Sequence, residues 1–233
     1  MKVLGIETAT RAGGVALLDD DRVVAEEFSD EDATHSKRLL PSIDRLLKKA
    51  EWRTEDIDLV AVSLGPGSFT GLRIGLSAAK GIAVAVGAQI IGVPTLEAFA
   101  FFLAKESGGL PIWPVIDARK EEVYAAPFDC DGRRLGPDEN ISPEALVEKI
   151  EGKVILAGDG VVRYEQLFLK ALGDNAVRPP GNPIAPRPNA VAELGIDMHR
   201  KGVGQSVESL APIYVRAPDA VINPRPIKKP SRI

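Results

Sequence analysis

The chain has 233 residues, of which 45% are hydrophobic and 27% are charged, so it can bury the core of one large or two small globular domains. Residues 1–212 carry 32 acidic and 24 basic side chains, and this negative balance argues against tight binding of a nucleic-acid backbone to that surface. A single cysteine excludes an internal disulfide, and no segment reads as a membrane span or signal peptide, so we expect a cytoplasmic protein.

The first hundred residues predict three strands followed by alternating helices and strands. We expect the strands at residues 3–8, 14–18 and 22–28. A helix is predicted at residues 34–50, because its leucines and isoleucines recur on one face at helical spacing. The half then continues with a strand at 59–64, a helix at 71–86, a strand at 89–93 and a helix at 95–105.

A glycine-rich run from Gly65 to Gly75 joins the strand at 59–64 to the helix that follows it. Glycines just before the start of a helix favour anion binding, because the backbone can approach the anion closely and the first amides of the helix are free to donate hydrogen bonds. However, the run has no lysine for a Walker A loop, and Gly71 comes one residue late for a dinucleotide fingerprint. Pro66 and Thr70 stand where a nucleophile elbow needs glycine, so the spacing weakens all three interpretations.

The helix predicted at residues 71–86 is apolar nearly all round. One stripe at helical spacing consists of Leu72, Leu76, Ala79, Ala83 and Val86, a second of Gly71, Gly75, Ala78 and Ile82, and a narrow polar one of Arg73, Ser77 and Lys80. One apolar face must cover the sheet, so the other needs a second cover. That cover is either another helix of this chain, at 34–50 or 95–105, or a partner protein.

The second half repeats the same order of elements. Strands are predicted at 112–117 and 121–128, with a weaker one near 133–135; a helix opens at 142–145, and a strand at 154–157 and helices at 161–172 and 188–200 complete the half. This duplication predicts two similar α/β lobes, residues 1–108 and 109–216, with a ligand cleft between them. Residues 217–233 are rich in proline and basic side chains and predict a flexible tail.

Few residues in the chain suggest catalysis. The only histidines, His35 and His199, are far apart and no Cys-x-x-Cys pair exists, which argues against a zinc or iron site. Glu7 and Asp117 end the first strand of each half, so the duplication would bring both carboxylates to the cleft. Such a pair could hold Mg²⁺ or act as a base, or merely cap turns.

Several segments taken together resemble the TsaB family, also called YeaZ. They are Ile6-Glu7-Thr8-Ala9-Thr10, the helix start from His35 to Pro41, the run from Gly65 to Gly75, the segment from Asp117 to Tyr124, and Pro212-x-Tyr214-Val215-Arg216. The resemblance spans residues 1 to about 216. It implies the fold of actin, sugar kinases and Hsp70-type ATPases, built from two duplicated RNase H-like lobes.

The resemblance also implies a function and partners. The chain would be a non-catalytic subunit of the bacterial machine that adds threonylcarbamoyl to the adenosine beside the anticodon of tRNAs reading codons that begin with A. It would bind its paralogue TsaD, which performs the transfer, with the ATPase TsaE joining the pair. When alone it would form a homodimer, and tRNA would be held mainly by other subunits.

Two groups of site residues follow from the resemblance. The partner-binding group lies on the helices that begin near His35 and Gly71, and comprises His35, Leu39, Gly71, Leu72, Arg73, Gly75, Leu76, Ala79 and Lys80. The nucleotide-cleft group comprises Glu7, Thr8, Asp117, Gly158 and Gly160. No catalytic residue, metal or cofactor is expected beyond weak binding of ATP or ADP, and Glu7 stands where the family places aspartate.

Two alternatives stay open from the sequence. A small-molecule kinase or ATPase of the same fold would use the nucleotide-cleft group. A metalloprotease is disfavoured, because the chain lacks the metal ligands that this chemistry uses.

Overall fold

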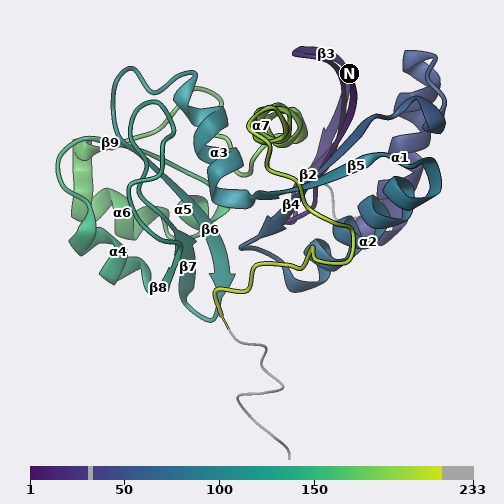
Figure 1. Ribbon diagram of the computed structural model, residues 1–233. Coiled ribbons are helices and arrows are strands. Elements are labelled where there is room, and N and C mark those ends of the chain that lie inside the picture. Colours follow the sequence, from purple (N-terminus) through teal and green to yellow (C-terminus); the bar gives the residue numbers. More distant parts are fainter. Residues whose placement is uncertain (31–33, 217–233) are drawn as a thin grey trace, which may run out of the picture.

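Two five-stranded sheets stand side by side in the computed structural model, which describes residues 1–30 and 34–216 (Figure 1). The first sheet has the order β3-β2-β1-β4-β5 and contains β1 (Lys2–Glu7), β2 (Gly13–Asp19), β3 (Arg22–Ser29), β4 (Leu59–Gly65) and β5 (Gln89–Pro94). The second has the order β10-β9-β6-β7-β8 and contains β6 (Ile112–Arg119), β7 (Glu122–Ala125), β8 (Glu139–Ile141), β9 (Val154–Ala157) and β10 (Ala176–Val177). The tail predicted at residues 217–233 lies outside the described residues.

The two sheets have the same topology. In each, the first strand pairs antiparallel with the second and parallel with the fourth, as β1 does with β2 and β4 and as β6 does with β7 and β9. A parallel neighbour needs a crossover connection, which a helix supplies in both halves. The predicted duplication into two α/β lobes is therefore confirmed.

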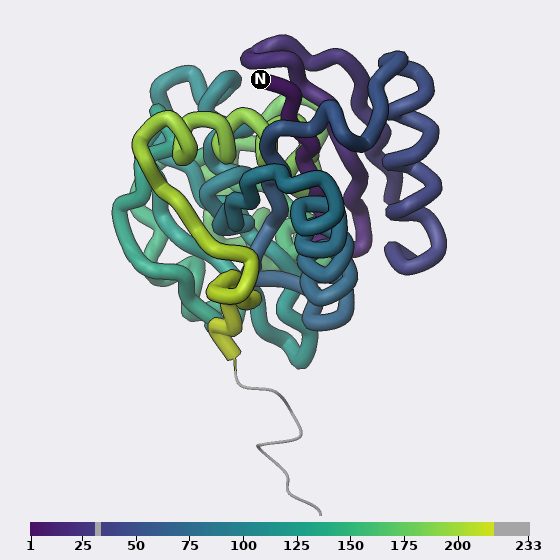
Figure 2. Tube along the Cα trace, turned by 45° about the vertical axis from the view of Figure 1, so that its right-hand side comes forward, coloured from purple at the N-terminus to yellow at the C-terminus, as the bar shows by residue number. Residues whose placement is uncertain are grey.

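The helices form layers around the sheets (Figures 1 and 2). α1 (His35–Ala50) and α2 (Phe69–Val86) cover one face of the first sheet, and α7 (Pro188–Arg200) covers the other. α3 (Thr95–Ala104) lies between the sheets, where it contacts α7 and β6. α4 (Pro143–Lys149), α5 (Asp159–Arg163) and α6 (Glu165–Leu172) lie on the outer face of the second sheet.

The position of β4 in the fold explains why its sequence is almost entirely apolar. All seven of its residues are buried. Val60 and Val62 face the core under α1 and α2, while Leu59 and Ala61 face the core under α7. A strand covered by helices on both faces needs apolar side chains at every position, which explains why its pattern shows no alternation.

Two predicted elements are corrected, and one further element was not predicted. The third strand of the second lobe lies at β8, not near residues 133–135, where Arg134 forms only an isolated bridge with Phe128 and its side chain pairs with Glu97 and Asp138. The helix predicted at 161–172 breaks at Tyr164, whose φ of −111° is not helical, into α5 and α6. β10 escaped prediction because it has only two residues.

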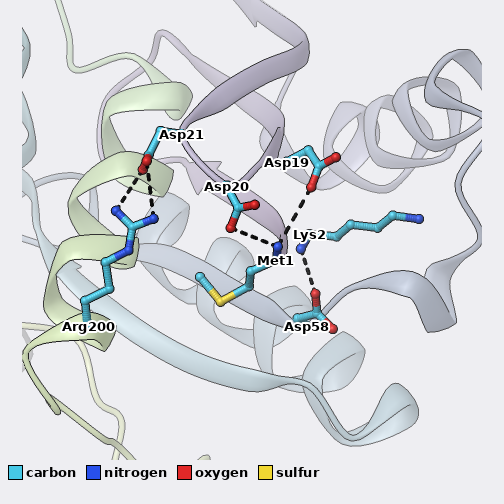
Figure 3. A network of polar contacts seen from close by, with 7 residues as sticks. All are labelled: Met1, Lys2, Asp19, Asp20, Asp21, Asp58 and Arg200. Atoms are coloured by element: carbon cyan, nitrogen blue, oxygen red, sulfur yellow. Dashed lines mark hydrogen bonds and ion pairs between the residues drawn. The ribbon is translucent and has the colours of Figure 1, made fainter.

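The chain returns to the first lobe after the second sheet. Val191, Ala192 and Ile196 of α7 are buried against the first sheet. At the end of α7, Arg200 donates to the Asp21 carboxylate at 2.9 and 3.3 Å, beside the contacts of the chain start with Asp20 and Asp58 (Figure 3). The division at residue 108 stays a prediction, and the lobe expected at 109–216 contributes this helix to the first sheet.

α2 has the length and composition of a membrane-spanning helix, although the sequence analysis predicted none. One such helix is weak evidence for a membrane, because a core helix has the same composition. The side chains of Leu72, Leu76, Ala79 and Ala83 are buried in this chain. Packing on its own sheet thus explains the apolar side chains on one face of α2.

Candidate functional site

α2 begins directly over the end of β1. The Ser68 hydroxyl caps the helix by accepting the Gly71 amide at 3.2 Å. A Cβ atom on Gly71 would overlap the carbonyl oxygen of Thr8, and one on Gly75 would overlap the hydroxyl of Thr8. The glycine stripe of α2 therefore lets the helix lie against Thr8, which is fully buried.

The predicted partner-binding group stays a prediction, but most of its members lie inside the chain. Six of its members are buried within this chain: Leu39, Gly71, Leu72, Gly75, Leu76 and Ala79. One apolar stripe of α2 packs on the sheet, whereas in the other Gly71 and Gly75 pack on Thr8 and Ala78 and Ile82 are only half-buried. Of the remaining members, Arg73 is exposed, while His35 and Lys80 are half-buried.

The outer face of α1 and α2 nevertheless exposes apolar side chains. Leu40 on α1 is 59% exposed and Val84 on α2 is 68% exposed. Ile74, Ala78 and Ile82 of α2 are only half-buried. The two helices lie in contact along the same face of the sheet, as Figures 1 and 2 show. We call Leu40, Ile74, Ala78, Ile82 and Val84 the outer helical face.

His35 joins α1 to the loop after β1. Its Nε2 lies 2.7 Å from the Thr10 carbonyl oxygen, and its Nδ1 lies 3.2 Å from the Arg38 guanidinium. Burial lowers the pKa of His35, and the charge of Arg38 lowers it further, so the ring is neutral at pH 7. Both ring nitrogens are engaged inside the chain, which assigns His35 a structural role. A small pocket beside it is lined by residues including Thr8, Glu27, Leu39 and Ser42.

Glu7 is fully buried at the end of β1. Its Oε1 accepts the Ala9 amide at 2.6 Å, and its Oε2 accepts the hydroxyl of Ser63 on β4. Burial raises the pKa of Glu7 to about 7, although both hydrogen bonds favour the charged form and oppose the rise. Both carboxylate oxygens are thus used within the first lobe.

Asp117 lies in a separate cluster at the end of β6. Its amide donates to Asp159 at 2.8 Å, and its carboxylate lies 3.5 Å from Arg119 and 3.4 Å from Arg163. Burial raises the pKa of the Asp159 carboxyl to about 6, and the charge of Asp117 also raises it. The acidic pair is therefore already neutralised in part by two arginines of the same lobe.

Gly158 and Gly160 join the Asp117 cluster as packing residues. Gly158 has a φ of +124°, and a Cβ atom there would overlap the carbonyl oxygen of Val115. A Cβ atom on Gly160 would lie 2.9 Å from the Val115 side chain. Because neither glycine has a side chain, the start of α5 can lie directly against β6. The space at both positions is therefore filled by atoms of the protein itself.

The expected nucleotide-cleft group is therefore divided between two clusters. Asp117, Gly158 and Gly160 lie together in the second lobe, while Glu7 and Thr8 lie under α2 in the first. The Glu7 oxygens bind protein groups and the backbone of Val115 lies directly against Gly158, and the nucleotide-cleft group stays a prediction. Within residues 1–30 and 34–216, no group of three His, Cys, Asp or Glu side chains could hold a metal ion.

The sequence analysis missed Ser63 and Arg163, and it left Asp159 out of the nucleotide-cleft group. Ser63 is the single polar residue inside the apolar strand β4, which is a signal that could have been used. Asp159 stands between two glycines directly after a buried strand. Arg163 carries no comparable signal, because only the short helix α5 brings it back to Asp117.

Comparison with known proteins shows similarity over nearly the whole chain. The family model for TsaD, tRNA N6-adenosine threonylcarbamoyltransferase, matches residues 23–179. The tRNA threonylcarbamoyladenosine biosynthesis protein TsaB of Bacillus subtilis is 30% identical over 226 residues, which is 94% of this chain and 96% of the relative. Among solved structures, YeaZ from Pseudomonas aeruginosa is 27% identical, with a TM-score of 0.79 over 91% of this chain and 99% of that one.

A more distant likeness concerns the fold alone. The activator of the 2-hydroxyisocaproyl-CoA dehydratase from Clostridium difficile, solved with bound ADPNP, is 13% identical, with a TM-score of 0.55 over 92% of this chain and 100% of that one. Together with the repeated strand order of the two sheets, it confirms the expected actin-like fold with two RNase H-like lobes.

Proposed function

The chain belongs to the TsaB family, and from this premise we propose that it is a non-catalytic subunit in tRNA threonylcarbamoyladenosine biosynthesis that acts by binding TsaD. The observation that carries the proposal is the outer helical face, an exposed apolar strip across two adjacent helices of the first lobe. Exposed and half-buried apolar side chains gathered on adjacent helices are typical of a protein-binding surface.

The polar clusters support a non-catalytic role. The carboxylates with raised pKa values, Glu7 and Asp159, both bind groups of their own lobe. Neither belongs to a group of three His, Cys, Asp or Glu side chains that could hold a metal ion in the part of the chain that the structure describes. This argues against a metalloprotease as well as against a transferase centre.

The partner arrangement follows from the same surface. TsaD would dock on the outer helical face, with TsaE joining the pair, and a second copy of this chain would occupy the face when TsaD is absent. tRNA would be held mainly by the other subunits, because residues 1–212 carry 32 acidic against 24 basic side chains. The cytoplasmic location of this assembly stays a prediction.

Charges on the outer helical face should prevent assembly. We expect Leu40→Glu and Val84→Glu each to weaken binding to TsaD at least tenfold, a loss of about 1.4 kcal/mol, because the new carboxylate must be desolvated in the interface. Isothermal titration calorimetry with TsaD measures the change, and sedimentation velocity measures whether the variants alone become monomeric.

Leu169→Glu is the matched control, because Leu169 is 51% exposed on α6 of the second lobe. It should bind TsaD as the unmodified chain does. Substitutions at Leu76 or Ala79 are unsuitable, since these side chains are 6% and 0% exposed and a charge there would unfold the first lobe. Unchanged affinity of both outer-face variants would place the interface elsewhere.

An activity assay tests the role itself. TsaD and TsaE should form threonylcarbamoyladenosine on tRNA only when this chain is added, and the outer-face variants should fail to restore the product. Product formation by TsaD and TsaE alone at the full rate would remove the proposed requirement for this subunit.

We expect the isolated chain to bind nucleotide weakly or not at all. The Glu7 oxygens and the space at Gly158 are occupied by protein groups, which supports at most weak binding of ATP or ADP. We expect calorimetry with ATP and Mg²⁺ to show no binding at micromolar concentrations. A micromolar dissociation constant that is lost in Asp117→Ala would instead favour a small-molecule kinase of the same fold.

A further inference from the structure

The segment from Gly204 to Arg216 leaves α7 and crosses from the first lobe to the second (Figures 1 and 2). It contains no helix and forms only an isolated bridge, from Gln205 to Ile90 on the edge strand β5. The Gln205 side chain also accepts the Gly92 amide at 2.8 Å. The segment therefore begins by covering an otherwise open sheet edge.

Its middle part is built into the first lobe at the carboxyl end of β4. Leu210 is buried in the core under α1 and α2. The Ile213 amide donates to the Leu64 carbonyl at 2.7 Å, and a Cβ atom on Gly65 would lie only 2.6 Å from the Ile213 carbonyl oxygen. Gly65, at the start of the glycine-rich run, thus lets this segment pass directly over the end of the strand.

Tyr214 then binds the first turn of α2. Its hydroxyl accepts a hydrogen bond from Arg73 Nε at 3.0 Å, and its ring centre lies 5.0 Å from that of Phe69. The Arg73 guanidinium also stacks over the Phe69 ring at 3.6 Å. These three side chains hold the segment to the helix that carries the outer helical face.

The next two residues belong to the second lobe. Val215 packs against the core between α3 and the second sheet. Arg216 donates to the Glu122 carboxylate on β7 at 3.1 Å, and Asn140 on β8 donates to the same oxygen at 2.7 Å. Adjacent residues, Tyr214 and Val215, therefore contact different lobes.

From this arrangement we infer that residues 204–216 form a latch that couples the first turn of α2 to the β7–β8 hairpin and so holds the two lobes in one relative position. A movement between the lobes must either stretch the chain between Tyr214 and Arg216 or break one of its two attachments, because two residues of extended chain span only about 7 Å. The attachments are few and lie near the surface, so the latch can open without unfolding either core.

Hydrogen–deuterium exchange of the isolated full chain tests the latch. We expect Arg216→Glu, a change at the second-lobe attachment, to raise amide exchange about tenfold at residues 65–72 of the first lobe. Tyr214→Ala, at the first-lobe attachment, should raise exchange to a similar extent at residues 122–125 of β7. Coupling between two sites requires that the effect be reciprocal.

Two further variants separate coupling from a loss of stability. Glu122→Arg combined with Arg216→Glu reverses the ion pair and should return exchange at residues 65–72 to the level of the unmodified chain. Arg178→Glu breaks the pair of Arg178 with Glu165, which has the same 3.1 Å separation but lies within the second lobe, and should leave residues 65–72 unchanged. Effects that stay local to each substitution, or a uniform rise across the whole chain, would overturn the latch.

Discussion

Gly71→Ala should destabilise the chain by about 3 kcal/mol or more, since the new methyl group overlaps the backbone oxygen of Thr8. The methyl group also comes within 3.3 Å of the His35 ring, so α2 cannot relax toward α1. The helix must instead move away from β1, which opens the core shared by α1, α2 and the sheet. Urea denaturation followed by circular dichroism measures the loss as a lower midpoint at constant slope.

Gly81→Ala is the matched control in the same helix. Gly81 is exposed, and a Cβ atom there would meet nothing within 4 Å beyond the backbone of its own helix. The substitution should stabilise the chain by about 0.5–1 kcal/mol, because alanine loses less conformational entropy in a helix than glycine. Equal effects at positions 71 and 81 would mean that helix propensity, and not contact with Thr8, determines the glycine at 71.

Gly75→Ala distinguishes backbone from side-chain contact. Its methyl group would meet the Thr8 hydroxyl, which can be removed, whereas Gly71 meets the Thr8 backbone. We therefore expect Thr8→Ala to recover a large part of the stability lost in Gly75→Ala and none of that lost in Gly71→Ala. A double-mutant cycle measures this coupling as the difference between the stability change of the double variant and the sum of the changes of the two single variants.

The second large effect is a pH dependence of stability that Glu7→Gln should abolish. The pKa of Glu7 is about 7 in the folded chain, against an ordinary value of 4.5, because the carboxyl is fully buried. Between these two pH values the folded chain holds a proton that the unfolded chain has lost. The contribution of Glu7 to the free energy of unfolding should therefore be largest below pH 4.5 and should fall by about 3 kcal/mol as the pH rises through 7.

Glu7→Gln keeps the size of the side chain without its charge, and its Nε2 can donate to the Ser63 hydroxyl as a protonated carboxyl would. The variant should match the unmodified chain near pH 4.5 and exceed it by about 3 kcal/mol at pH 8. Urea unfolding at a series of pH values measures both proteins. The Asp159 carboxyl, whose pKa burial raises to about 6, titrates in both, so the difference between the two curves isolates Glu7.

Ser63→Ala provides an independent variant for the same group. The Ser63 hydroxyl favours the charged form of Glu7, so its removal should raise the pKa of Glu7 further and move the transition to higher pH. Parallel stability curves for the unmodified chain and Glu7→Gln would show that Glu7 titrates as an exposed carboxyl does.

Local patterns in the sequence were enough to predict the fold class and the duplication. The apolar run of β4, the helical spacing of α1 and the repeated order of strands and helices depend on local spacing, which the sequence displays directly. The motifs at residues 6–10, 65–75 and 212–216 similarly identified the family without knowledge of the fold. Short elements such as β8 and β10 were missed because two or three residues carry too little pattern.

Which face of α2 is free depends instead on tertiary packing. Periodicity shows that α2 has two apolar stripes, but it cannot show that Thr8 lies against Gly71 and Gly75 of the second one. The same holds for Glu7 and Asp117, which have equivalent places in the two sheets but different hydrogen-bond partners. Contacts between residues far apart in the chain depend on how whole elements pack. The spacing of apolar residues within one helix or strand does not determine that packing.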